Sequence, residues 1–106
     1  MATVFVNAIS RAVGTTEVIS FTAPEKSIVI GCNLTNLTST TVPITLVLRR
    51  GVTDTYVQKN RRVDAGEPFE LMKGNKLVLD AGDKLVVSAA VDSSVDAVFS
   101  ILQGVA

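Results

Sequence analysis

The chain has 106 residues, a length that suits one domain spanning residues 1–106. Ten basic and ten acidic residues give a formal net charge of zero, so overall charge provides no long-range attraction to nucleic acid or to an anionic membrane. With no histidine and one cysteine, the sequence excludes an intrachain disulfide and the Cys–His pair of a thiol hydrolase.

The first half of the chain is rich in the β-branched residues that favour strands, and Gly, Pro and Asn interrupt it at short intervals. We predict a turn at Gly14, a break at Pro24 and a loop over residues 35–40. In the third predicted strand, the alternation places Ile28, Ile30, Cys32 and Leu34 on one face. In the fourth, Ile44, Leu46 and Leu48 are expected inward and Val47 outward. The predicted strands are Thr3–Ala8, Glu17–Phe21, Ser27–Leu34 and Thr41–Arg49.

The second half continues the pattern, with turns expected at 64–68, 73–75, 80–83 and 92–94. The last strand should place Ala97, Phe99 and Ile101 on one face and Val98 and Leu102 on the other. A strand that is apolar on both faces is either central in its sheet or covered by a neighbouring chain. The predicted strands are Thr53–Lys59, Phe69–Met72, Leu77–Leu79, Lys84–Val91 and Val95–Gln103.

These elements predict an all-β domain, a single antiparallel sandwich of about eight short strands that is jelly-roll-like or immunoglobulin-like. The sequence is unusually apolar for 19% charged residues, with 47% hydrophobic residues and a mean hydropathy of +0.41. No segment approaches the ~18 consecutive apolar residues of a membrane helix, and the first residues lack the pattern of a signal peptide. The apolar excess is therefore expected to fill an efficient core or to contact other subunits.

The acidic residues do not predict an active site, because most lie in turns, where aspartate bonds to local backbone groups. We predict no catalytic residue, no enzyme activity and no cofactor. A calcium site would require Asp80, Asp83, Asp92 and Asp96 to converge at one end of the sandwich. Without the spacing of an EF-hand, solvated turns are the preferred interpretation, and no metal site is predicted.

Half of the positive charges fall within fourteen positions, opposed there only by Asp54. This group could bind nucleic acid, protect a sheet edge from unwanted pairing, or complement the charge of a neighbouring subunit. Nucleic-acid binding is the least favoured, because Tyr56 is the only nearby aromatic residue for base stacking. The candidate interface residues are Arg49, Arg50, Lys59, Arg61, Arg62, Val98 and Leu102.

The chain contains several sequence motifs that occur together, in this order, in one family of proteins. A Thr-x-Pro turn precedes an apolar strand that ends in Asn and Thr, a short Tyr-Val-x-Lys strand follows, and a long strand–turn–strand motif leads to the last strand. In this respect the chain resembles the small β-sandwich virion proteins of tailed bacteriophages. The motifs are Thr22-Ala23-Pro24, Ile28-Val29-Ile30-Gly31, residues 33–36, Tyr56-Val57-Gln58-Lys59, residues 76–85 and residues 96–102.

The resemblance implies a non-enzymatic structural component of a virion, assembled in the host cytoplasm. It implies most directly a capsid decoration or cement protein, with a neck or tail accessory protein or a fibre-associated structural protein as the alternative. The expected partners are further copies of the chain, with a trimer favoured, and the major capsid protein or neck and tail proteins. No membrane is expected as a partner. A carbohydrate-binding module on the virion surface is a further alternative, although sugar sites usually present exposed aromatic rings.

Overall fold

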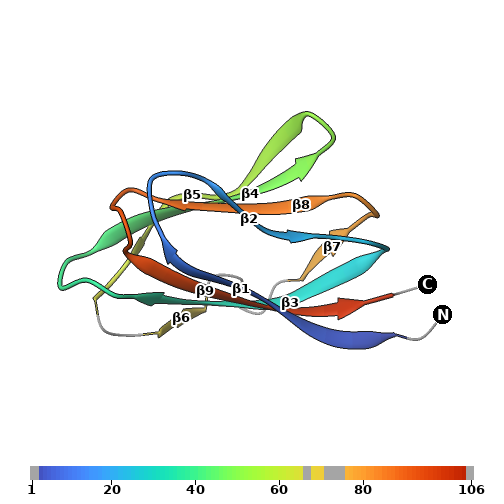
Figure 1. The fold of residues 1–106 in the computed structure, drawn as a ribbon, viewed down its shortest axis with the longest axis horizontal. Coiled ribbons are helices and arrows are strands. Elements are labelled where there is room, and N and C mark those ends of the chain that lie inside the picture. Colours follow the sequence, from blue (N-terminus) through green and yellow to red (C-terminus); the bar gives the residue numbers. More distant parts are fainter. Residues whose placement is uncertain (1–2, 66–67, 71–75, 105–106) are drawn as a thin grey trace.

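The computed structural model describes residues 3–65, 68–70 and 76–104. These residues form nine β-strands and no helix, and every strand pair is antiparallel (Figure 1). The predicted fold class, an antiparallel β-sandwich, is confirmed. The strands are β1 (Val4–Val13), β2 (Val18–Thr22), β3 (Ser27–Asn36), β4 (Val42–Arg50), β5 (Thr53–Val63), β6 (Pro68–Glu70), β7 (Leu77–Leu79), β8 (Lys84–Ala89) and β9 (Val95–Gln103).

The strand order is that of a jelly roll rather than an immunoglobulin domain. One sheet has the order β1-β9-β3-β6, with β7 also paired to β3, and the other has the order β2-β8-β4-β5. Strands β6 and β7 pair with opposite ends of β3, at Asn33–Thr35 and Ser27–Val29, and so act as two halves of one interrupted strand. Counted in this way, the chain winds back and forth between two sheets of four strands, the arrangement of a jelly roll.

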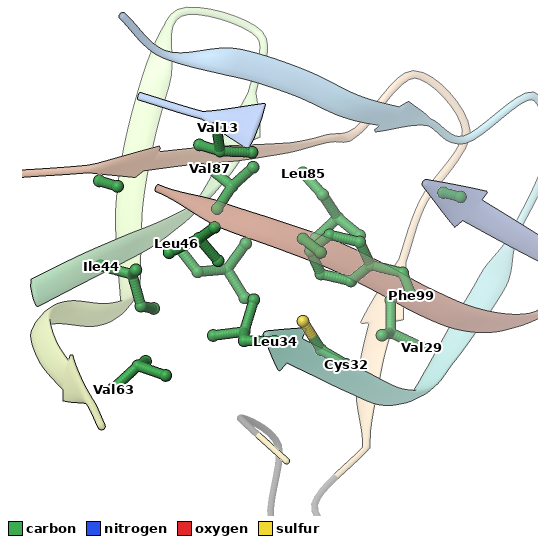
Figure 2. Close-up of a cluster of buried hydrophobic side chains, with 14 of the residues drawn as sticks. Val13, Val29, Cys32, Leu34, Ile44, Leu46, Val63, Leu85, Val87 and Phe99 are labelled. Carbon is green, nitrogen blue, oxygen red and sulfur yellow. The ribbon is translucent and has the colours of Figure 1, made fainter. Parts of the chain in front are cut away.

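The core lies between the two sheets and is built from the inward face of each (Figure 2). Phe99 is fully buried at its centre, and β9 contributes Ala97 and Ile101 to the same face. The predicted alternation in β9 is confirmed, and β9 is central in its sheet, between β1 and β3. Ile44 and Leu46 of β4 are also buried, as predicted, and Leu48 packs against the core while half-buried.

Three strands extend further than the sequence pattern indicates. Strand β1 continues to Val13, β3 to Asn36 and β5 to Val63, because pairing with a neighbour carries the strand through residues such as Ser10, Asn36 and Arg62, which have little strand preference of their own. Strand β8 ends at Ala89, before the predicted end at Val91. The predicted strand end at Met72 and the turn at 73–75 lie outside the described residues.

The predicted inward face of β3 is wrong in its first half because of a β-bulge. The register with β9 shifts between Val29 and Gly31, so Ile30 is the extra residue. Val29, Cys32 and Leu34 are fully buried, whereas Ile30 is exposed. An uninterrupted period of two cannot reveal such a bulge, because one inserted residue reverses the phase of the alternation that precedes it.

The single cysteine lies in this core as an inert thiol. Cys32 is fully buried, and its burial, with a smaller contribution from the charge of Glu70, raises the pKa of the thiol to about 12. At pH 8 only about one thiol in 10⁴ would be ionised even if reagent could reach it. We expect no reaction of the folded chain with Ellman's reagent at pH 8, and one thiol per chain in guanidinium chloride. Rapid labelling of the folded chain would contradict this burial.

Candidate interaction surface

The predicted basic group does not form a single patch, because two of its five members are ion-paired within the chain. Arg49 donates hydrogen bonds to Asp54 at 2.7 Å and to Glu17 at 2.9 Å. Arg50 bonds to Asp83 at 2.7 Å, and its guanidinium lies 3.4 Å from Asp80. Three of these four acids come from other parts of the sequence, so the local excess of positive charge that the sequence shows is largely neutralised in the fold.

The ion pair between Arg49 and Glu17 also covers part of the outer face of its sheet. Glu17 directly precedes β2 and Arg49 lies on β4, and β8 separates these two strands. The pair must therefore cross the outer face of β8. Val86 of β8 lies outside the core cluster and is flanked on this outer face by Ile19 and Val47, and with the ion pair nearby it is only 2% exposed. Val47 points outward, as predicted, yet is buried on this covered face.

The other three basic residues lie near the far end of β5. Lys59, Arg61 and Arg62 line a shallow depression together with Gln58, Asn60 and Asp64. The Lys59 ammonium lies 4.8 Å from the centroid of the Tyr56 ring, and the Arg61 guanidinium lies 4.7 Å from that of Phe69. Lys59 lies over one face of the 56%-exposed Tyr56 ring, so a sugar or a base would have to displace this ammonium to stack on that face.

Asp83 is the most buried acid of the described residues, and Arg50 keeps it charged. Its side chain is 3% exposed and also accepts a hydrogen bond from the Asp80 backbone N–H at 2.8 Å. The hydrogen bond from Arg50 lowers the pKa of Asp83, against the opposing effect of burial. A depressed folded-state pKa stabilises the fold above the unfolded-state value of about 3.9, and this stabilisation is lost as the pH falls through the folded-state pKa.

We therefore expect Asp83→Asn to lower the free energy of unfolding by about 1–3 kcal/mol at pH 7, through weakened hydrogen bonds to a charged group. The difference from the wild type should shrink as the pH falls below the unfolded-state pKa. Urea titrations of both chains at a series of pH values would measure it. The exposed Asp64→Asn is the matched control and should change little, and a pH-independent difference would contradict the role of the charge.

The acidic turns do not converge. Asp80 and Asp83 precede β8, whereas Asp92 and Asp96 follow it. Asp92 accepts a hydrogen bond from the Thr15 hydroxyl, and Asp96 accepts one from the Ala12 backbone N–H. Within residues 3–65, 68–70 and 76–104, no three His, Cys, Asp or Glu side chains form a cluster that could hold a metal ion. In the same part of the chain, no helix has the length and apolar character needed to cross a membrane.

Several exposed apolar side chains gather on the outer face of the β1-β9-β3 sheet, whereas Ile19 and Tyr56 are exposed on the other sheet. The register aligns Phe5, Leu102, Ile28 and Val78 in one row across four strands. A second apolar pair, Ile9 and Val98, lies beyond the polar pair Asn7 and Ser100. We call this surface the apolar outer face; its residues are Phe5, Ile9, Ile28, Ile30, Val78, Val98 and Leu102.

The apolar outer face contains residues that are strongly exposed. Phe5 is 76% exposed and Ile9 54%, while Val98 and Leu102 are half-buried. A groove runs along it, lined in part by Phe5, Asn7, Ile30 and Ser100. The sequence placed Val98 and Leu102 on the outward side of β9, because that strand alternates on both faces, but it did not indicate that Phe5 and Ile9 face outward beside them. The apolar residues at positions 4–6 hide the alternation of β1, and only the pairing with β9 shows which of them face outward.

No protein-family model matches the sequence, and no curated protein matches it. Among solved structures, two crystal structures of a pentameric capsid protein isolated from metagenomic phage sequences share the fold, with a TM-score of 0.51 and 16% identity over 93% of this chain. The chain spans about three fifths of that protein, 60% in one structure. A protein of Bacillus endospore appendages, which form disulfide-linked pili, matches with a TM-score of 0.50 and 17% identity over 99% of this chain and 87% of its own. At these identities the likeness shows a common fold, a β-sandwich that also occurs in proteins of a phage capsid and of a pilus.

Proposed function

We propose that this chain is a non-enzymatic structural protein of a bacteriophage virion, held in the particle by its apolar outer face. The observation that supports this most strongly is the contrast between the two sheets. On one outer face, Val86 and Val47 are buried near the Arg49–Glu17 ion pair, although Ile19 at 48% and Tyr56 at 56% remain exposed at its two sides. The other outer face presents a more extensive row of exposed and half-buried apolar residues. The fold shared with a phage capsid protein and the motifs of small virion proteins support the same role.

Within that role we propose a decoration or cement protein, which adds many weak contacts between capsid subunits. Each contact is modest, but contacts made by many copies together resist internal pressure. We propose that the chain self-associates. The resemblance to virion proteins implies a trimer, but the capsid protein that shares the fold is described as pentameric, so the comparison does not support three copies. A neck or tail accessory protein is the alternative location.

Purified particles from cells that produce the chain test this role directly. Mass spectrometry should detect the chain in the particles, and antibody labelling should cover the whole shell. Labelling at a single vertex or along the tail would assign it to the neck or tail instead. Particles made without the chain should release their DNA at a lower temperature. Its absence from mature particles would overturn the virion role.

A pair of valine variants tests the proposed binding face. Val78 lies on the apolar outer face and is 50% exposed, and Val52 lies between β4 and β5 and is fully exposed. We expect Val78→Asp to abolish binding to particles that lack the chain, because it introduces an unpaired charge into an apolar contact. Val52→Asp should bind as the wild type does. Equal binding by both variants would exclude this face.

A further inference from the structure

The four sheet edges are protected to very different degrees. Strand β2 has five residues and a bulge, and β7 has three residues. Strand β5 is long, but it contains two register shifts, carries Lys59 and Arg62, and has Asn60 in a left-handed conformation with φ of 52°. Short length, bulges and charges are the devices that stop edge strands from pairing with other chains.

Strand β1 has none of these devices over most of its length. It is ten residues long, and its register with β9 is unbroken from Val4 to Ser10. This stretch contains no proline and no charged residue, and the first charge on the strand is Arg11. Among the described strands β1 pairs only with β9, so every second residue directs its backbone N–H and C=O away from the sheet. Near its far end β1 approaches β2, where the Ser10 and Ser20 hydroxyls are hydrogen-bonded at 2.6 Å through their side chains.

We propose that β1 pairs antiparallel with β1 of a second copy of this chain, about a two-fold axis at Asn7. This inference depends on the sheet edges and not on the virion role, so either can fail without the other. In this register, Phe5 lies opposite the partner's Ile9 and Asn7 lies opposite the partner's Asn7. The first pair joins an aromatic to a branched apolar side chain, and the second can form an amide hydrogen bond.

The absence of charged residues from the centre of β1 favours a second copy as the partner. Two-fold pairing brings each residue near its own equivalent, so a charge at the centre would oppose itself. The stretch from Val4 to Ser10 is free of charge, and Arg11 would lie opposite the partner's Thr3. The pairing satisfies the outward backbone groups of both edges and joins the two sheets. It also makes the apolar outer faces of the two copies continuous, because Phe5 and Ile9 lie at the shared boundary.

Introducing a charge at Asn7, on the proposed two-fold axis, tests this arrangement. Light scattering should give twice the chain mass of 11.2 kDa for the wild type and once that mass for Asn7→Lys and Asn7→Glu alone. An equimolar mixture of the two variants should restore the doubled mass, because lysine then faces glutamate. The matched control is Asn33→Lys, an exposed asparagine of β3 away from the edge, which should remain dimeric. A monomeric wild type, dimeric single variants or a mixture that stays monomeric would each overturn the proposal.

A disulfide provides a second measurement that does not depend on destabilising the contact. Native Cys32 is buried, so Asn7→Cys adds the one accessible thiol. Under mild oxidation Asn7→Cys should convert to a cross-linked dimer, because facing residues of paired strands lie within disulfide reach. Asn33→Cys should stay monomeric on a denaturing gel. Equal cross-linking of the two variants, or none of either, would contradict pairing at Asn7.

Discussion

Replacing Phe99 with alanine is expected to destabilise the fold by about 3–5 kcal/mol. Phe99 is fully buried between the two sheets, and its partners on either side are Ala8 of β1 and Cys32 of β3. Both neighbours are small and cannot fill the space that the ring leaves. Since a domain of this size is typically stable by about 5–15 kcal/mol, the variant should be close to unfolding at room temperature.

Thermal unfolding followed by circular dichroism would measure this effect as a drop in Tm of roughly 15–30 °C. Phe5→Ala is the matched control, because it removes the same ring from a site that is 76% exposed. Measured in dilute solution, the Tm of this control should stay close to that of the wild type. Similar Tm values for Phe99→Ala and the wild type would show that the core does not depend on this ring.

Asn36→Ala is expected to cost about 2–4 kcal/mol, through hydrogen bonds rather than through packing. The Asn36 amide nitrogen donates to the backbone carbonyls of Thr40, at 2.7 Å, and Val63, at 2.9 Å. Its oxygen accepts from the backbone N–H and from the hydroxyl of Thr38, each at 2.8 Å. One buried side chain thus joins the end of β3, the loop after it and the end of β5.

Alanine at this position leaves the Val63 carbonyl without its amide donor inside the protein. Urea unfolding should show a lower midpoint with an unchanged slope, because the surface exposed on unfolding stays the same. Asn33→Ala, three residues earlier on the same strand and exposed, should leave the midpoint almost unchanged. A midpoint for Asn36→Ala equal to that of this control would show that the amide does not hold the two sheets together.

The sequence predicted the fold class and most strand positions because both depend on local patterns. The strict alternation in β9 identified Phe99 as inward and Val98 as outward, and the turn at residues 80–83 is where the sequence placed it. The bulge at Ile30 was not predictable from the pattern. It is defined by where β9 pairs with β3, which is a contact between distant segments.

The candidate surface was less predictable, because it depends on which strands become neighbours. The sequence showed Arg49 and Arg50 in a basic group, but Glu17 and Asp83 are 32 and 33 positions away from them and become their partners only in the folded chain. Asn36 resembled an ordinary loop residue, since its role depends on the carbonyl of Val63. The exposed edge at β1 likewise becomes visible only when all four edges are compared.

The pairing of β1 with β9 has a consequence for how the protein is made. Val4 lies opposite Gln103, so the first described strand to leave the ribosome finds its partner in the last. Until translation has passed residue 95, β1 has no neighbour in its own sheet and both of its edges are open. Closing such a distant contact is slow, and the waiting segment is apolar. The nascent chain therefore completes its fold late, and chaperones that shield apolar segments should raise its yield most while β1 is still unpaired.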